Sequence, residues 1–331
     1  TSSVQPFAAM QNVALNAIKH HRNTVLNNAG QCEKKGFTVD DSKYCFYSDY
    51  LNTKSYIYGD ESYGGYNTAD SNYSYSLEYS LDNQWTIGGA FGHGKSVLDN
   101  YSFGGSTATI NSSNRFYSIY STKESTSKKI KYSGIISVAD FDYDSTRTLS
   151  SNTTTGQYDG DGYSAELNAT WNHIVDSKIL SPNKTKFFIK PLIGVAYGHH
   201  RQGAFSESGT DAMTLSAGNS DSLLLKTGVN VATQVPTNNG KWLFVPKIAL
   251  NCEYDVMADD DDSRSLEAKL ANSSTAATRV FSKTLGEMQG SINLGADLHL
   301  TKNFLINTNV SIAATSEGSQ NSIGGGFNWS F

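Results

Sequence analysis

Apolar and polar positions alternate strictly over the last residues of the chain. From Ile323 to Phe331 the odd positions hold Ile, Gly, Phe, Trp and Phe, and the even positions hold Gly, Gly, Asn and Ser. Successive side chains of a strand point to opposite faces, so one face is apolar and the other is small and polar. A soluble sheet with the chain end at its edge explains the alternation, but an aromatic last residue is unusual at a terminus. Lipid outside and water inside explain both features.

Composition narrows the class of protein further. No run approaches the roughly 18 consecutive apolar residues of a membrane helix, which excludes a helical membrane protein. The chain contains 19 Tyr, 15 Phe and 29 Gly but only 5 Pro, which is typical of strands joined by polar turns. The net charge of -5 and the lack of a basic cluster give no reason to expect a nucleic-acid partner.

The same alternation predicts about twelve strands. They cover residues 44–59, 72–81, 85–91, 111–124, 130–138, 163–171, 187–197, 223–235, 242–254, 292–300, 304–312 and 323–331. The connections alternate in length: short at 82–84, 125–129, 177–184, 236–241 and 301–303, long at 60–71, 99–110, 145–158, 201–221 and 258–283. This parity predicts an all-β fold, a transmembrane antiparallel up-and-down β-barrel, with both barrel termini at the rim of the short turns.

Four tryptophans support one membrane interface. Each lies next to a predicted short turn, where an interfacial girdle of aromatic residues is expected: Trp85, Trp171, Trp242 and Trp329. Closure of the barrel requires the terminal strand 323–331 to pair with the first strand, because an open edge cannot remain in lipid.

One convincing helix precedes the strands, from about Ser3 to Ala29. Pro6 suits a first turn and Gly30 follows as a stop signal. The residues that we expect to dock it inside the barrel pore are Phe7, Met10, Ala14, Ile18, Arg22 and Val25. Its apolar face is too thin for stability alone, so we expect contact with a partly polar interior; a peripheral helix is the alternative. The predicted domains are this helix (1–31), a connector (32–43) and the barrel (44–331).

Charged residues on the predicted inner face are the candidate pore lining. They are Glu78, Lys131, Glu166, Lys190, Lys226, Lys247, Glu253, Asp297 and His299. Two interpretations are open: these residues line a solvated pore, or they form a charged wall that holds the basic, Asn-rich helix.

Cysteine use and the chain start add two expectations. Cys32 and Cys45 are close enough to close a short disulfide-linked loop in an oxidising compartment, and two separate thiols are the alternative. Thr1-Ser-Ser-Val lacks the basic start and apolar core of a signal peptide. A membrane barrel without one is expected to be a piece of a longer protein.

The sequence contains none of the common catalytic or metal-binding motifs. The sequence holds no Gly-x-Ser-x-Gly and no His-Glu-x-x-His, and its cysteines do not have zinc-site spacing. His199, His200 and Asp255 can be combined into an acid/base pair only with geometry that the sequence does not supply. The run Asp259 to Asp262 is interpreted as a solvated loop tip, with weak calcium binding as the alternative. We expect no enzyme activity, no metal and no cofactor.

Three features together resemble a known family: the helix, the twelve strands and the aromatic end. Trp85-Thr-Ile-Gly-Gly-Ala-Phe-Gly-His-Gly94 and Phe327-Asn-Trp-Ser-Phe331 are similar to an early hairpin and the closing strand of the translocator domain of classical (type Va) autotransporters. The resemblance implies an integral, monomeric outer-membrane barrel with extracellular long loops and periplasmic barrel termini. It also implies that the helix stays in the pore after export of an upstream passenger, and that Phe327, Trp329 and Phe331 are read by the barrel-assembly machinery.

Some members of that family cleave their own pore helix after an asparagine. Asn27 and Asn28 resemble such a site, with Glu78, Glu166 or Asp297 to orient them, but the surrounding residues do not match the cleaving subgroup. A helix-end Asn pair without a chemical role is therefore expected. The alternative functions are a solute channel and an outer-membrane hydrolase.

Overall fold

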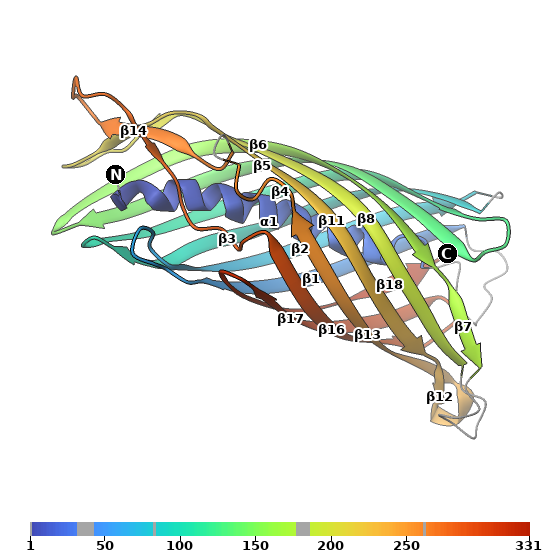
Figure 1. Cartoon of the computed structure of the whole chain (residues 1–331). Helices are drawn as coiled ribbons and strands as arrows, with labels where there is room; N and C mark the ends of the chain where they lie inside the picture. Colours follow the sequence, from blue (N-terminus) through green and yellow to red (C-terminus); the bar gives the residue numbers. More distant parts are fainter. Residues whose placement is uncertain (1, 32–42, 82–83, 177–185, 261–262) are drawn as a thin grey trace.

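A closed barrel of twelve long antiparallel strands surrounds one helix (Figure 1). The computed structural model describes residues 2–31, 43–81, 84–176, 186–260 and 263–331. The helix consists of a short η1 (Ser2–Val4) and α1 (Gln5–Asn28). The barrel strands are β1 (Tyr44–Ile57), β2 (Tyr66–Ser80), β3 (Trp85–Phe103), β4 (Ser106–Glu124), β5 (Ile130–Leu149), β6 (Asn152–Trp171), β8 (Lys186–Gln202), β11 (Gly218–Thr233), β13 (Trp242–Asp255), β16 (Met288–His299), β17 (Phe304–Thr315) and β18 (Gly318–Ser330).

Every barrel strand pairs with the next one, and β18 closes the circle on β1. The closing register runs from Cys45 opposite Ser330 to Ile57 opposite Gly318. Beyond it, Tyr44 and Phe331 exchange two backbone hydrogen bonds of 3.0 Å. The predicted pairing of the terminal strand with the first strand is confirmed. Near the short turns, β7 (His173–Asp176) pairs with β8, and β12 (Val235–Thr237), followed by η3 (Asn238–Gly240), pairs with β13.

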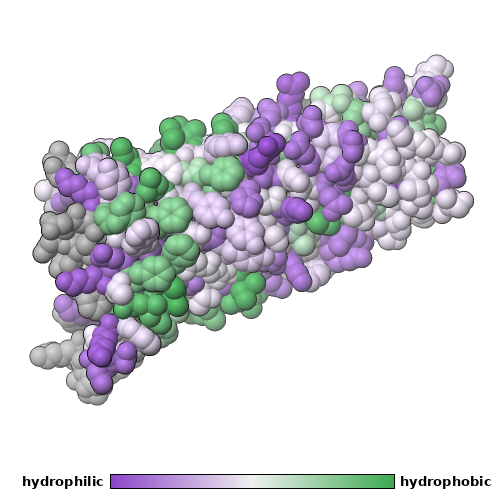
Figure 2. Space-filling model, turned by 180° about the vertical axis from the view of Figure 1, so that it is seen from behind, coloured by the Kyte–Doolittle hydropathy of each residue, from purple (hydrophilic) through white to green (hydrophobic). Residues whose placement is uncertain are grey.

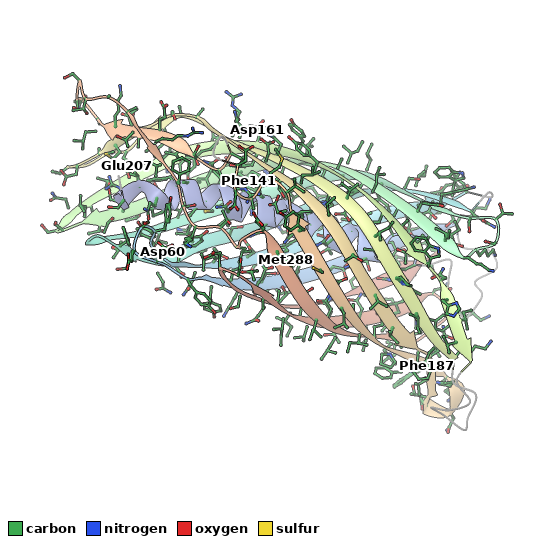
Figure 3. The ribbon with its side chains drawn as sticks, viewed as in Figure 1. Asp60, Phe141, Asp161, Phe187, Glu207 and Met288 are labelled. Carbon is green, nitrogen blue, oxygen red and sulfur yellow. The ribbon has the colours of Figure 1, made fainter. Side chains whose placement is uncertain are left out.

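An apolar belt covers the outside of the barrel near the short turns. Figure 2 shows hydrophobic side chains gathered toward that end and hydrophilic ones beyond them. Across β5 and β6 the boundary is sharp, because exposed Val138 lies opposite exposed Tyr163 while Asp140 lies opposite Asp161 one step further along. Figure 3 shows Asp161 directed away from the barrel. All four tryptophans lie at the short-turn rim with exposed side chains, as predicted.

Two of the five predicted long loops were wrong. Residues 99–110 and 145–158 mostly continue the strands, so that tight turns at 104–105 and 150–151 join β3 to β4 and β5 to β6. Likewise, β2 begins at Tyr66, inside the predicted loop 60–71. The prediction failed because it ended each strand where its outer face stopped being apolar. Backbone pairing needs no lipid, and it continues beyond the belt with a polar outer face.

The remaining two long connections form a small second sheet, which we call the cap sheet. Its strand order is β15 (Thr278–Val280), β14 (Leu266–Leu270), β10 (Met213–Leu215) and β9 (Phe205–Ser206). A backbone bridge between Thr155 and Ser208 attaches it to β6. Leu215 and Leu266 of this sheet are buried in one cluster with Val4 and Phe7 of the helix. The end of the barrel that carries the cap sheet is called the long-loop end below.

The helix runs lengthwise through the barrel. Its first residue lies at the long-loop end, and its last turn lies toward the short-turn rim, where the chain also ends (Figure 1). Nineteen of its residues are buried, including basic and amide side chains. Within the described ranges, no helix is long and apolar enough to cross a membrane. Because the connector falls largely on residues 32–42, outside the described residues, the predicted domain boundaries stay a prediction.

Candidate functional site: the pore helix and the barrel wall

A buried cluster of charges joins the middle of the helix to one side of the wall. Arg22 donates from Nε to Oε1 of Glu166 on β6 at 2.8 Å, and Lys226 on β11 contacts the same carboxylate at 3.1 Å. Asn168 donates to Glu166 Oε2 at 2.7 Å, and Lys226 also reaches Asn23 Oδ1 at 2.8 Å. The carboxylate thus has one partner on the helix and two on the wall. Such saturation is needed for burial of a charge.

A second ion pair holds the same face of the helix about one turn earlier. Lys19 lies 3.1 Å from Glu253 on β13 and also donates to Gln289 on β16 at 3.3 Å. The two clusters place helix cations against wall carboxylates on β6 and β13, two strands that are not neighbours. The helix is therefore fastened to this side of the wall at two points about one turn apart.

The last turn of the helix has its own set of contacts. Glu78 Oε2 accepts from the Gly30 backbone N–H at 3.1 Å and from the Tyr120 hydroxyl at 3.0 Å, while Tyr47 donates to Oε1. Lys131 donates to the carbonyl of Ala29. A cation at that place is favoured by the negative end of the helix dipole.

His21 fixes the distance between the helix and β3. Its ring stacks on Phe116 with centroids 4.9 Å apart and an interplanar angle of 11°, and its Nε2 lies 2.7 Å from Ser118 Oγ. Gly92 of β3 pairs with Phe116, and a Cβ atom at Gly92 would stand 2.5 Å from His21 Nδ1. The contact is possible because position 92 has no side chain.

The first half of the helix is held by aromatic and apolar residues. Phe7 packs edge-on against Phe205 and Tyr158 at centroid distances of 5.2 and 6.0 Å. Phe141 of β5 belongs to the same buried cluster and points toward the helix in Figure 3. The long-loop half of the lumen is thus filled by an apolar core, whereas the other half contains ion pairs and hydrogen bonds.

A buried ion pair ties the cap sheet to the wall beside the start of the helix. Arg147 of β5 donates to both carboxylate oxygens of Glu207, at 3.0 and 2.5 Å, and to Ser3 Oγ at 3.2 Å. Glu207 also accepts from the Met213 backbone N–H at 2.9 Å. The exposed fractions of the two side chains are 1% and 0%. Figure 3 shows Glu207 near the start of the helix.

Comparison of the sequence with known protein families gives one match that covers most of the chain. The family model for the autotransporter β-domain matches residues 47–311, most of the chain. The chain belongs to this family. The family implies an integral outer-membrane protein with a linked passenger. A comparison with curated proteins found no match.

Solved autotransporter barrels share the fold of this β-domain. The translocator domain of NalP from Neisseria meningitidis is 12% identical, with complete coverage of both chains and a TM-score of 0.71. The transport unit of AIDA-I from Escherichia coli is 13% identical over 94% of this chain and 98% of that one, with a TM-score of 0.68. The β-domain of BrkA from Bordetella is 13% identical over 88% of this chain and all of that one, with a TM-score of 0.59.

The predicted helix residues are all buried in the β-domain: Phe7, Met10, Ala14, Ile18, Arg22 and Val25. Of the predicted inner-face charges, Glu78, Lys131, Glu166, Lys226 and Glu253 contact the helix as described. Lys247 pairs instead with Asp297 at 2.7 Å, Lys190 lies over the ring of Phe188, and His299 is buried. Their roles in lining a pore stay a prediction.

The proposed self-cleavage pair has a different carboxylate neighbour from those expected. Asn28 Nδ2 donates to Asp49 of β1 at 2.5 Å, while the Asn27 side chain is exposed. None of Glu78, Glu166 and Asp297 has a hydrogen bond to either Asn side chain within the described residues. Self-cleavage at this pair stays a prediction.

Other sequence candidates remain untested. Cys45 is buried and Cys252 is a free thiol, but Cys32 lies outside the described residues, so their disulfide stays a prediction. Two residues of the Asp259 to Asp262 run, 261 and 262, also lie outside them. Among the residues that are described, no group of three or more His, Cys, Asp or Glu is arranged to hold a metal ion.

Sequence reasoning missed Asp49, Arg147 and Glu207. Asp49 shares the inner face of β1 with Tyr47. The alternation of that strand indicates this position only weakly. Arg147 and Glu207 were assigned to loops. A signal for Arg147 existed in the alternation before it, because Phe141 and Tyr143 are apolar and occupy the same inner face at odd positions.

Proposed function

We propose that this β-domain anchors an upstream passenger in the outer membrane and exports it through or beside the barrel pore. The observation that carries the proposal is the helix itself, which runs through a closed barrel and begins at the long-loop end. In this proposal the long loops are extracellular and both barrel termini are periplasmic. The passenger then continues from the start of the helix on the cell surface.

The contacts of the helix favour a closed translocator over an open solute channel. Ion pairs hold the helix in the short-turn half, and an apolar core surrounds it in the long-loop half. Planar bilayers test this directly. The intact chain should show low conductance, and deletion of residues 1–31 should raise it several-fold.

Folding of the deletion variant is checked first by circular dichroism and by heat-dependent migration on gels. If that variant does not fold, Phe7→Ala in the complete chain provides a second route, because it opens the apolar core without removing the helix. Strong conductance of the intact chain would favour the solute channel. Equal, low conductance of all folded chains would contradict a plug role for the helix.

Export and orientation are tested in cells. An epitope placed before Thr1 should become accessible to external protease, and Ser151→Cys in the β5–β6 turn should react with an impermeant maleimide. Lys128→Cys in the β4–β5 turn, the matched control, should remain unlabelled in intact cells. The opposite labelling pattern would overturn the orientation.

The barrel-assembly machinery is the proposed partner for insertion. Trp329 and Phe331 are 50% and 49% exposed on the outer face, and Phe331 stacks on Tyr44 with centroids 5.7 Å apart. Because these aromatic side chains lie at the end of β18, beside the seam with β1, the assembly machinery can reach them before the barrel closes. No catalytic step is proposed for this chain.

A further inference from the structure

A lysine lies beside each of the four tryptophans at the short-turn rim. Lys123 of β4 is opposite Trp85 of β3, and its Nζ atom lies 5.0 Å from the centroid of the indole ring. Lys241 directly precedes Trp242 at the start of β13. Both pairs combine a ring that suits the membrane interface with an amine next to it.

Backbone hydrogen bonds bring the other two lysines to their tryptophans. The N–H of Asn172 donates to the carbonyl of Lys129 at 2.7 Å, directly after Trp171 at the end of β6. Lys302 lies in the β16–β17 turn, whose last residue accepts a hydrogen bond of 2.8 Å from the N–H of the residue after Trp329. The lysines are therefore spread around the rim together with the tryptophan girdle.

Several exposed lysines at this rim belong to no ion pair within the described residues. They are Lys128, Lys129, Lys241 and Lys302. Water usually satisfies an exposed lysine, so the lack of an ion pair alone indicates no ligand. What distinguishes these lysines is their position beside the aromatic girdle, where lipid headgroups meet a barrel.

The two borders of the apolar belt carry opposite charges on the same pair of strands. At the short turns of β5 and β6, Lys128 and Lys129 are exposed. Beyond the belt at the other border, the outer face of β5 and β6 presents five exposed aspartates: Asp140, Asp142, Asp144, Asp159 and Asp161. Arg115 of β4 pairs with only one of them, Asp142. An anionic headgroup is therefore attracted at the short-turn rim and repelled by these strands at the other border.

The chemistry of the rim fits a phospholipid phosphate. A lysine lays its aliphatic stem along an apolar surface and keeps its amine in the polar layer. Beside an indole ring at the membrane interface, this layer contains the phosphate groups of the lipids. A lysine close to an anionic bilayer surface strengthens the attraction about fivefold, and a zwitterionic lipid lacks the net charge that this attraction needs.

We propose that the lysines of the short-turn rim bind the phosphate groups of anionic phospholipids, such as phosphatidylglycerol, in the membrane leaflet at that rim. These lipids then form a layer around the base of the barrel that is richer in anions than the surrounding membrane. The inference needs only a barrel in a membrane, so it holds whether or not a passenger is exported.

The tryptophans provide the measurement, because all 4 tryptophans of the chain lie at this rim. The complete chain is refolded into vesicles that mix phosphatidylglycerol with phosphatidylcholine. One of the two lipids carries bromine atoms near the headgroup end of its acyl chains, which quench indole fluorescence on contact. We expect phosphatidylglycerol to bind beside the tryptophans about threefold better than phosphatidylcholine. The preference should fall toward equality in about 1 M NaCl, because salt screens exposed charges.

Removal of rim lysines localises the effect. One variant combines Lys129→Gln, Lys241→Gln and Lys302→Gln, which removes three positive charges from the rim and should reduce the preference to less than about 1.5-fold. The native fold of each variant is checked first by heat-dependent migration on gels.

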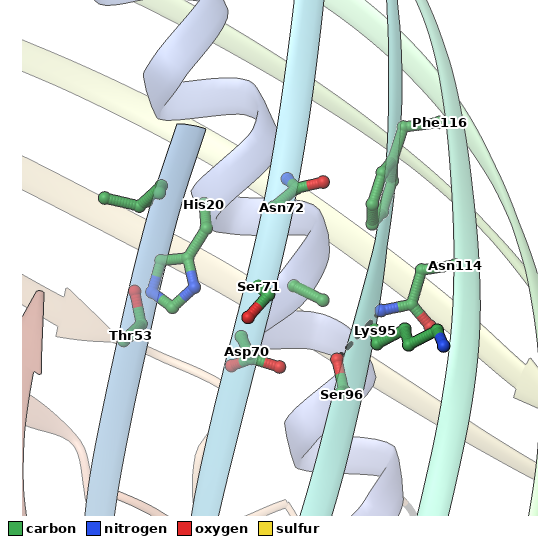
Figure 4. A pocket seen from close by; sticks show the side chains of 11 residues that line it. His20, Thr53, Asp70, Ser71, Asn72, Lys95, Ser96, Asn114 and Phe116 are labelled. Carbon is green, nitrogen blue, oxygen red and sulfur yellow. Dashed lines mark hydrogen bonds between the residues drawn. The ribbon is translucent and has the colours of Figure 1, made fainter. Parts of the chain in front are cut away.

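A matched control removes the same charge away from the short turns. It combines Lys54→Gln, Lys95→Gln and Lys269→Gln, three exposed lysines of β1, β3 and the cap sheet. Figure 4 shows Lys95 on β3, apart from His20 of the helix. This control should keep the full preference.

Three results would overturn the proposal: equal quenching by the two brominated lipids, a preference that the rim variant keeps, or a preference that the control variant loses to the same extent. The last result would assign the preference to the net charge of the whole chain. If the rim variant does not fold, the salt series of the complete chain decides. A preference that persists in about 1 M NaCl would then contradict binding by exposed lysines.

Discussion

Arg22 and Glu166 form an ion pair of 2.8 Å between the helix and β6, with exposed fractions of 2% and 1%. The surroundings exclude solvent from the pair, and Lys226 shares its carboxylate. The helix therefore cannot leave the pore without separating Arg22 from the Glu166 carboxylate, which would then keep only Lys226 and Asn168 of the wall as partners. This relationship leads to the first of five expectations.

Glu166→Gln should loosen the helix strongly, because it leaves the cations of Arg22 and Lys226 buried without an anion. Removal of one partner of a buried pair costs about 3 kcal/mol, which corresponds to about a 100-fold increase in the open fraction. The open fraction is measured as the share of time that the pore conducts in planar bilayers. As a control, Asp142→Asn breaks the exposed pair with Arg115 and should change the same quantity by less than about 1 kcal/mol. Equal effects of the two variants would contradict the assignment.

Glu207→Gln should open the long-loop end. The variant leaves the Arg147 guanidinium partly unpaired in an interior that excludes solvent, at a cost of about 3 kcal/mol. Limited proteolysis should then cut the cap sheet connections at least about tenfold faster, while the barrel stays intact. Glu267→Gln changes an exposed carboxylate of the same sheet and should leave the cleavage rate unchanged. A slow rate in both variants would show that the apolar core alone holds the sheet.

Gly92→Ala should displace the helix, since the new methyl group would lie 2.5 Å from His21 Nδ1 and 3.2 Å from Phe116. Overpacking of this kind costs about 1–3 kcal/mol and should lower the thermal midpoint. Gly89→Ala on the same strand is the matched control, because its new methyl group would lie 3.8 Å from the Ser118 carbonyl oxygen, an ordinary contact distance. Addition of His21→Ala to Gly92→Ala should recover part of the loss. If the thermal midpoint of the double variant does not recover, the clash of Gly92→Ala is not with His21.

The contact of Lys283 with Asp60 and Glu317 should depend on pH. Its amine lies 2.7 Å from Asp60 and 2.8 Å from Glu317. The hydrogen bond to Lys283 lowers the pKa of Asp60 below 3.8, and the two carboxylates raise the pKa of Lys283 above 10.5. The lowered carboxyl pKa gives a stabilisation present above pH 3.8 and lost as pH falls through the folded value. The raised amine pKa gives one present below pH 10.5 and lost as pH rises through the folded value.

Hydrogen exchange of the segment around Lys283 can follow this contact. Protection should be greatest between about pH 4 and 10 and should fall toward acid, after correction for the intrinsic exchange rate. Lys283→Met should show low protection with no such dependence. An acid-induced loss of the same size in Lys283→Met would assign the titration to other groups.

Phe331→Ala should separate barrel stability from recognition by the assembly machinery. The side chain is half exposed and stacks on Tyr44 alone among the first-strand aromatics, so spontaneous refolding in detergent should change little. Insertion by the purified machinery should slow several-fold. Ile323→Ala, which alters the same outer face further from the end, is the control. Equal slowing of refolding and of assisted insertion would remove the recognition role.

Much of the barrel could be predicted because lipid imposes one rule on every strand. Where the outer face contacts lipid, as at Ile136 and Val138, apolar residues must alternate with the inner face, and the pattern is visible in the sequence. Beyond the belt, Asp140 to Leu149 obey no such rule, so the length of β5 was missed. Arg147 was therefore assigned to a loop, and its partner Glu207 lies in the long connection after β8, where no alternation applies.

The candidate site was predictable in part for a related reason. Alternation assigns Glu166, Lys226 and Glu253 to the inner face, but it says nothing about which helix residue each one meets. That depends on the rotation and depth of the helix, which no short sequence pattern encodes. Asp49 was missed because polar residues are common on both faces of β1.

The apolar core at the long-loop end has a consequence for the order of folding. Phe7 of the helix and Leu266 of the cap sheet meet there although more than 200 residues separate them in the chain. The cap sheet has only short strands and buries its leucines against the helix, so it has little to fold on beforehand. We therefore expect the cap sheet to fold only after the helix has docked in the barrel, so that closure of the long-loop end is a late step of folding.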